Sequence, residues 1–268
     1  MSIVDFKTPP VVEAGIAVYF ESVPFLNNIN LTARAFELVS AFGFKMPNLE
    51  QTLYIEMRDE TEVPKSVQNF SFSQGVQKTG IRITSSDGTS RLDIQDNRFG
   101  YTWVQQNDCD YPRYEELKNT FVEKFNIFCN GVPTLGVISP KITQAGIQYV
   151  NLLDDDNGNA YELLNLIDLE SFRNHEAIHF YTRQRLTEKE EIGRLYLAFD
   201  TVTNFENTKS GDLEQKRKLK FALTFRGKPK ENGIDGLANF IDRGRESIVN
   251  TFSMSLSEKG RAEFGQES

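Results

Sequence analysis

The segment VVEAGIAVYF, Val11–Phe20, indicates how the whole chain is organised. Its β-branched and aromatic residues predict a strand, which two prolines precede. Its AGI triplet, residues 14–16, returns 131 residues later, at residues 145–147, within a second strand-like segment, ITQAGIQYVNLL. A strand that recurs at a fixed offset is typical of an internal duplication.

The same offset relates two long helices that we expect further along the chain. It superposes NTF at residues 119–121 on NTF at residues 250–252. Apolar side chains three or four residues apart predict an amphipathic helix around each triplet. In the first helix, which Gly131 ends, these are Tyr114, Leu117, Phe121, Phe125 and Phe128. In the second, at about residues 234–256, they are Leu237, Ile241, Ile248, Phe252 and Leu256.

Short strand-like segments lie between each first strand and its long helix. In the first half a short helix is expected at residues 32–43, where Thr32 can cap its start and Gly43 can end it. An Asp-Gly pair within residues 86–89 then predicts a hairpin turn. In the second half a helical stretch at residues 159–172 precedes strand-like segments at 175–186, 193–205 and 218–228.

The sequence therefore predicts an α+β fold with two related halves, residues 1–135 and 136–268. Each half is expected to be an antiparallel β-meander packed on a long amphipathic helix, so that the chain is a helix-grip-like tandem. The two halves are expected either to share one extended sheet or to pack face to face.

Composition narrows the class of protein. The chain has 268 residues and a net charge of −8, which argues against general attraction to nucleic acid. No apolar run is long enough to span a membrane and no signal peptide is recognisable, so we expect a cytoplasmic protein. Two cysteines, Cys109 and Cys129, are too few for a disulfide framework and are expected to be reduced thiols.

One motif suggests catalysis. HEAIH at residues 175–179 contains the only two histidines, His175 and His179, around Glu176, as in zinc peptidases. On a helix, two such imidazoles bind zinc and the glutamate acts as a general base. A third ligand would have to be a carboxylate; the candidates are Glu188, Glu190, Glu191 and Asp200.

A β-strand is the alternative interpretation of the same motif. Residues four apart lie on one face of a strand as well as of a helix, so the spacing does not discriminate. The order of elements in the first half favours a strand here, and Arg173 is unusual beside a buried zinc helix. We therefore expect no metal cofactor, with zinc at His175 and His179 as the alternative.

A basic segment lies at residues 209–230. If it binds nucleic acid, the candidate residues are Lys216, Arg217, Lys218 and Lys220. The favoured interpretation is a solvated sheet edge on which lysines deter aggregation.

The remaining sequence patterns do not indicate a binding or catalytic site. The acidic run at residues 154–159 lacks the glycine and glutamate spacing of a calcium-binding loop, and no phosphate-binding glycine loop is present. Trp103 is expected in the core or on a sheet face rather than in a base-stacking platform.

Four segments resemble a sporadically distributed family of uncharacterised bacterial proteins of similar length. They are TPPVVEAGIAVYF, LDIQDNRFGYTWVQQNDCDYPRYEELKNTF, AGIQYVNLL and IVNTFSMSLSEKGRAEFG. Within the second segment Tyr101-Thr102-Trp103 departs from the family pattern, which more often has asparagine before the tryptophan. The resemblance implies a bacterial or phage origin and a shared fold, but no activity.

Taken together, these patterns predict a non-enzymatic binding or interaction protein. Its partner is expected to be a small ligand or another protein, and self-association into a homo-oligomer is left open. The distribution of the resembling family suggests an accessory or phage-conflict role. The alternatives are a zinc-dependent hydrolase and a nucleic-acid-associated protein, on the residues given above.

Overall fold

The computed structural model describes residues 5–23, 35–43, 48–55, 77–106, 109–130, 140–155, 159–165, 179–188, 191–207 and 213–267. The strands are β1 (Asp5–Phe6), β2 (Val11–Phe20), β3 (Asn48–Ile55), β4 (Gln77–Thr84), β5 (Ser90–Gln95), β6 (Arg98–Val104), β7 (Ile142–Asp154), β8 (His179–Glu188), β9 (Glu191–Asn207), β10 (Leu213–Gly227) and β11 (Gln266–Glu267). The helices are α2 (Ala35–Ala41), α3 (Tyr114–Asn130), α4 (Asn159–Glu162), α5 (Gly233–Ser255) and α6 (Glu258–Glu263).

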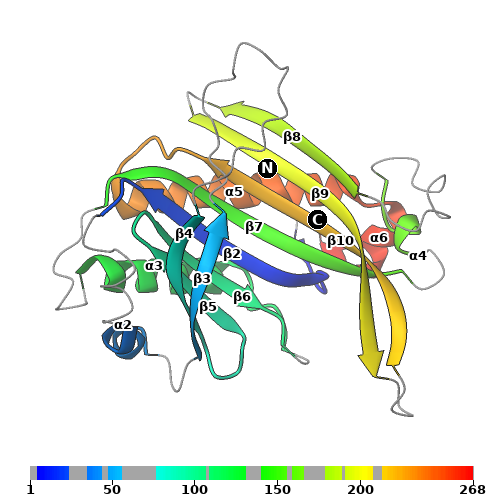
Figure 1. Ribbon diagram of the computed structural model, residues 1–268. Coiled ribbons are helices and arrows are strands. Elements are labelled where there is room, and N and C mark those ends of the chain that lie inside the picture. The colour runs from blue at the N-terminus through cyan, green and yellow to red at the C-terminus, as the bar shows by residue number, and fades with distance from the viewer. Residues whose placement is uncertain are drawn as a thin grey trace, which may run out of the picture.

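Within these ranges the chain forms a mixed α and β structure around one large antiparallel sheet (Figure 1). The nine strands follow the order β3-β4-β5-β6-β2-β7-β10-β9-β8, so β2 and β7 pair at its centre. A separate pair joins β1 to β11, which brings the two ends of the chain together. Of the two arrangements expected for the halves, the structure has the extended sheet.

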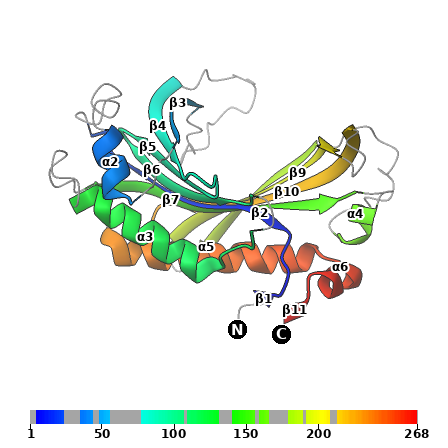
Figure 2. The same cartoon turned by 90° about the horizontal axis from the view of Figure 1, so that it is seen from below.

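Both long helices lie on one side of the sheet (Figure 2). α3 packs on β6 and β2, and α5 packs on β7, β10 and β9. The apolar stripes expected for the two helices are buried there, including Phe121 and Phe125 of α3 and Ile241 and Phe252 of α5. In both helices the apolar residues recur about every 3.6 positions, and burying this stripe against the sheet explains why these segments are helical.

The core between helices and sheet is rich in phenylalanine. Phe99 of β6 is fully buried, and its ring centroid lies 5.0 to 6.1 Å from those of Phe42, Phe121, Phe125 and Phe128. Such spacings are those of favourable aromatic pairs. This cluster holds α2 and α3 to β6.

Glycine lets α5 approach the sheet closely. A Cβ atom at Gly244 would lie 2.6 Å from Cδ1 of Phe225 and 2.9 Å from Cγ2 of Ile147. Both distances are too short for a real side chain, so only glycine permits this separation between α5 and strands β7 and β10.

Several expected elements are confirmed. The first strand, both long helices and the short helix before Gly43 appear at the expected positions. The Asp-Gly turn is also present, and Gly88 has a φ of 76°, which favours glycine. Trp103 is 5% exposed, as expected for a core residue. Thr32 lies outside the described residues.

Two expectations hold only in part. The helical stretch at residues 159–172 is only the four-residue α4 in its described part, because Leu164 leaves the helix to bridge with Leu256. The basic segment is a sheet edge only at residues 213–217, which pair with β9 alone, because residues 218–227 of β10 lie between β7 and β9. Of the strand-like segment at 175–186, residues 179–186 belong to β8, and the earlier ones lie outside the described residues.

Among the helices that the structure describes, none combines the length and apolar character needed to cross a membrane.

Candidate functional site

A cavity of about 380 Å³ lies between the sheet, α5 and the segments that precede β2 and α3. It is lined by Asp5, Phe6, Pro9, Val11, Tyr111, Arg113, Tyr114, Glu115, Tyr149, Asn151, Leu223, Arg245, Ile248, Val249 and Phe252. The wall is therefore mostly apolar and aromatic, with a few polar groups. That combination is characteristic of small-molecule sites.

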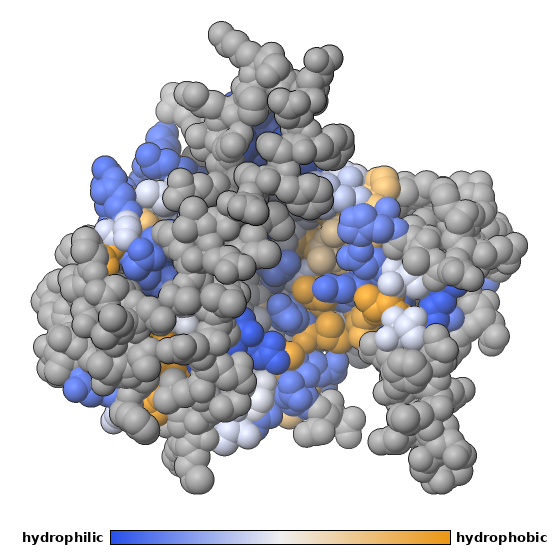
Figure 3. Space-filling model, in the orientation of Figure 1, coloured by the Kyte–Doolittle hydropathy of each residue, from blue (hydrophilic) through white to orange (hydrophobic). Residues whose placement is uncertain are grey.

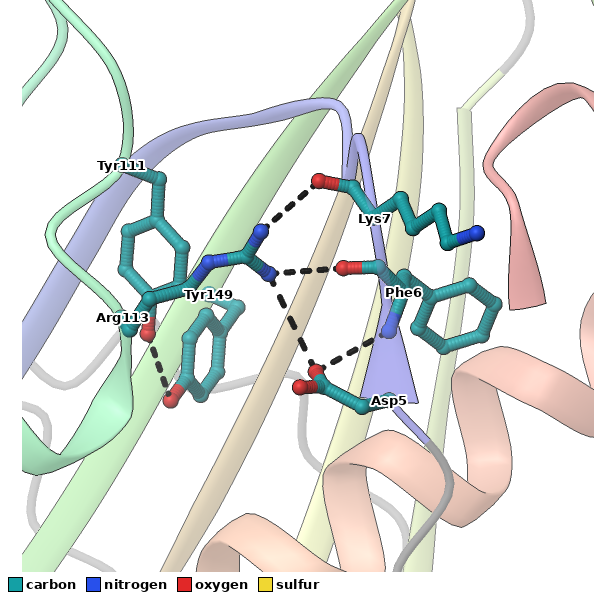
Figure 4. A network of polar contacts seen from close by, with 6 residues as sticks. All are labelled: Asp5, Phe6, Lys7, Tyr111, Arg113 and Tyr149. Carbon is teal, nitrogen blue, oxygen red and sulfur yellow. Dashed lines mark hydrogen bonds and ion pairs between the residues drawn. The ribbon is translucent and has the colours of Figure 1, made fainter. Parts of the chain in front are cut away.

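The N-terminal segment is held over the cavity by Arg113 (Figure 4). Its guanidinium donates to the carbonyl oxygens of Phe6 and Lys7 at 2.6 and 2.7 Å, and lies 3.9 Å from Asp5. The segment is also tied to the C-terminus through the pairing of β1 with β11. Arg113 therefore holds the N-terminal segment in place as one wall of the cavity, and its guanidinium is occupied by these contacts rather than by a ligand.

The backbone of Arg113 is unusual. Its φ is 69°, and it is the only non-glycine residue with positive φ in the part of the chain that the structure describes. Such backbone costs on the order of 1 kcal/mol or more for most residues and persists where the surroundings hold it. Here the two hydrogen bonds to the N-terminal segment hold it, immediately before α3 begins.

Two tyrosines meet at the floor of the cavity. Tyr111 comes from the loop before α3 and Tyr149 from β7, and the Tyr111 hydroxyl donates to that of Tyr149 at 3.1 Å (Figure 4). Burial raises the pKa of Tyr149 to about 12, against the opposing effects of this hydrogen bond and of Arg245. Burial also raises the pKa of Tyr111. Both hydroxyls therefore stay protonated near neutral pH.

The proton of Tyr149 is available to a ligand. Its oxygen already accepts from Tyr111, and no acceptor for its own proton lies within hydrogen-bond distance among the described residues. The hydroxyl is therefore a buried donor at the cavity, and burial without an acceptor is costly.

A second polar group ties the two long helices together beside the cavity. The hydroxyl of Tyr114, in α3, donates to the carboxylate of Asp242, in α5, and Lys118 lies 2.8 Å from the same carboxylate. Burial raises the pKa of Tyr114, and the hydrogen bond to Asp242 adds to the effect. Asp242 is therefore engaged by α3 and does not face Arg245 as a counter-ion.

Arg245 is the cation left at the cavity. It lies on α5 with its guanidinium carbon 4.9 Å from the centroid of the Tyr114 ring. Within the described ranges it has no carboxylate within 4.0 Å, although Asp5 and Glu115 also line the cavity. It is close enough to lower the pKa of both Tyr111 and Tyr149, an effect smaller than that of burial. Arg245 and the Tyr149 hydroxyl can therefore bind one anionic group together.

The residues of the HEAIH motif are only partly described. His175 and Glu176 lie outside the described residues, so zinc binding there stays a prediction. His179 is the first residue of strand β8, and its Nδ1 contacts the carboxylate of Asp200, one of the candidate third ligands. No group of three or more possible metal ligands occurs in the described part of the chain.

The predicted nucleic-acid residues lie on β10, and none of them lines the cavity. Two of them pair with acids at the end of β7: Arg217 Nε lies 3.0 Å from Asp155 and Lys218 Nζ lies 3.2 Å from Asp154. Lys220 is directly opposite Asp200 in β9. Much of the positive charge expected there is therefore balanced locally.

Sequence reasoning did not find the cavity residues. No motif joins Tyr111, Arg113, Tyr149 and Arg245, and they meet only because the loop before α3 packs against β7 and α5. One signal was present: the YPRY run places a tyrosine and an arginine immediately before an amphipathic helix that begins with a second tyrosine.

A scan against models of known protein families finds none that matches this chain, and a search of curated proteins finds no match either. The likeness to the sporadic bacterial family therefore stays a prediction.

The buried tyrosines predict a loss of stability in alkali. Because the pKa of Tyr149 is raised from 10.0 to about 12, the folded state holds this proton more tightly than the unfolded state. The contribution of this proton to the free energy of unfolding is complete below pH 10 and is lost as the pH rises towards 12. The expected loss is roughly 2 to 3 kcal/mol. Denaturant unfolding of wild type and Tyr149→Phe between pH 8 and 11.5 should show a smaller alkaline loss in the variant. Equal alkaline losses of stability in wild type and Tyr149→Phe would contradict the raised pKa of Tyr149.

Proposed function

We propose that this protein is a non-enzymatic binding protein whose cavity takes a small amphipathic molecule with one anionic group. The anion, a carboxylate or a phosphate, accepts hydrogen bonds from Arg245 and Tyr149. The apolar body of the ligand lies against Leu223, Ile248 and Phe252, which line the same cavity. The observation that carries the proposal is a cavity-lining arginine without a carboxylate partner among the described residues.

The energetics favour an anion over a neutral ligand. A hydrogen bond to a charged group contributes about 1.5 to 3 kcal/mol, roughly twice a neutral one. Tyr149 adds a neutral donor that does not ionise in the working pH range. A neutral analogue would leave the cation of Arg245 without a partner, and therefore loses affinity.

The test compares matched charged and uncharged probes. Hexanoate, cinnamate and phenyl phosphate would be titrated by calorimetry against wild type, with hexanol and cinnamyl alcohol as neutral analogues. We expect the anions to bind and Arg245→Met to weaken them by about 10- to 100-fold. The alcohols should bind weakly to both proteins.

Arg261→Met is the matched control, because Arg261 is an exposed arginine of α6 that does not line the cavity. It should bind the anions like wild type. The proposal fails if the alcohols bind as tightly as the anions, or if Arg245→Met binds normally.

We further propose that residues 1–135 and 136–268 descend from one duplicated sheet-and-helix unit, each half gripping its long helix. The strand order supports this, because β6, β5 and β4 lie outward from β2 as β10, β9 and β8 lie outward from β7. Register supports it as well: Ile16 and Ile147, which the 131-residue offset relates, are directly opposite each other. A Cβ at Gly15 or at Gly146 would meet the neighbouring outer strand, β6 or β10, in the same way.

A duplicated fold also accounts for the position of the cavity. Tyr111 comes from the first half and Tyr149 and Arg245 from the second, so the proposed site lies where the two halves meet. Ligand sites commonly form at such junctions.

A further inference from the structure

The sheet has a second face, turned away from α3 and α5. Phe221 of β10 contacts Phe252 of α5, so it faces the helices, as do its cross-strand neighbours Phe199 and Phe180. Side chains alternate along a strand. The residues next to these phenylalanines therefore point to the opposite face, which we call the outer face.

Arginines line up on the outer face across three strands. Arg185 of β8 is directly opposite Arg194 of β9, which is directly opposite Arg226 of β10. Arg183 lies two residues from Arg185 on the same face and is also exposed. The surface over these strand ends, at the upper left of Figure 3, is hydrophilic.

This row of arginines destabilises the folded protein when no partner is bound to it. Neighbouring strands are about 4.8 Å apart, so like charges lie close together, and like charges directly opposite are destabilising. Arg183, Arg185 and Arg226 make no ion pair with any residue whose side chain the structure describes. Asp200, a described acid on this face, is engaged by His179. A polyanionic partner would relieve the repulsion.

Two tyrosines continue the row. Tyr181 is 55% exposed, and its ring centroid lies 6.1 Å from that of Tyr196. Arg226 lies over the Tyr196 ring at 5.8 Å, and Tyr196 is directly opposite Arg183. Exposed aromatic rings beside arginines on a sheet face provide both stacking surfaces for bases and charges for phosphates.

We propose that this arginine-tyrosine surface, formed by Tyr181, Arg183, Arg185, Arg194, Tyr196 and Arg226, binds single-stranded nucleic acid. A base stacks on Tyr181, and the arginines contact the flanking phosphates. A duplex keeps its bases stacked inside and cannot use the ring, and an acidic peptide has no base to stack. The surface differs from the predicted basic patch and is independent of the cavity and its ligand. The net charge of −8 does not oppose it, because the charge here is local.

The test is fluorescence anisotropy with labelled twelve-nucleotide U and dT strands, a duplex of the same length and labelled polyglutamate. Single strands are expected to bind, with a slope of log K against log salt of about −2, since each of three neutralised phosphates contributes roughly −0.7. Arg183→Glu with Arg185→Glu should abolish binding at 100 mM salt. Tyr181→Ala should weaken it about 5- to 100-fold with little change in slope, because it removes stacking and no charge.

Arg261→Glu, on α6, is the control for a single charge reversal away from this surface and should bind like wild type. Circular dichroism and the unfolding midpoint show whether each variant is folded. The proposal is overturned if no single strand binds at 20 mM salt, or if the duplex or polyglutamate binds as tightly as the single strands. It is also overturned if folded Tyr181→Ala or the double arginine variant binds normally. Cavity binding by the anionic probes is unaffected in every case.

Discussion

Phe99→Ala is expected to lower the free energy of unfolding by about 3 to 5 kcal/mol, the largest effect of any substitution considered for this protein. Phe99 is fully buried, and its ring packs against Phe42, just after α2, and against three phenylalanines of α3. Removing it leaves a cavity at the point where both helices meet β6. Since native proteins are stable by only about 5 to 15 kcal/mol, such a loss is easily measured.

Equilibrium unfolding in urea, followed by circular dichroism, would measure the change. Tyr181→Ala is the matched control, because Tyr181 is an aromatic strand residue in the same sheet but is 55% exposed. It should lose far less stability than Phe99→Ala. Similar losses in the two variants would mean that the phenylalanine cluster is not the main contribution to the packing of α3.

Gly244→Leu is expected to cost about 1 to 3 kcal/mol or more and to abolish binding of the anionic probes. A side chain at this position meets Phe225 and Ile147, so α5 must move away from the sheet. Arg245 is the next residue and Ile248 lies one turn further, and both line the cavity. Gly244→Leu therefore changes both the packing of α5 on the sheet and the shape of the cavity.

Asn250→Leu provides the control on the same helix, because Asn250 is exposed. It should leave both stability and probe binding close to wild type. Calorimetry and urea unfolding would be run on the same preparations. If Gly244→Leu binds the probes normally, the close approach of α5 does not shape the cavity.

These two variants separate the fold from the proposed functions. Phe99→Ala weakens the half of the sheet remote from Arg245, whereas Gly244→Leu acts beside it. Neither touches Arg183 or Arg185. A folded Gly244→Leu protein that loses the anionic probes but still binds single strands would show that the cavity and the outer face act independently.

The elements that the sequence predicted well are those set by local periodicity. Phe121, Phe125 and Phe128 fall on one stripe at a spacing of three or four residues, and all are buried in α3. The Asp-Gly turn required one residue with positive φ, and Gly88 has it. In each case the local structure is determined by a few neighbouring residues, so the sequence pattern is sufficient to predict it.

Sequence reasoning was less successful where the reason is not local. Lysine and arginine in residues 209–230 were interpreted as an exposed edge. Residues 218–227 of β10 instead lie between β7 and β9, and Arg217 and Lys218 pair with Asp155 and Asp154. Which strand lies beside which depends on the order of the whole sheet, and no window of sequence contains that order.

The sequence by itself determined the class of fold, the two long amphipathic helices and the strands at the sheet centre, because hydrophobic periodicity and turn chemistry act over a few residues. Only the tertiary structure decided the cavity and the arginine-tyrosine surface. Tyr111 meets Tyr149 across 38 residues of chain, and Arg185, Arg194 and Arg226 line up only through strand register. Such sites form when sheet pairing and helix packing bring distant side chains within a few ångströms, and that proximity has no signature in local sequence.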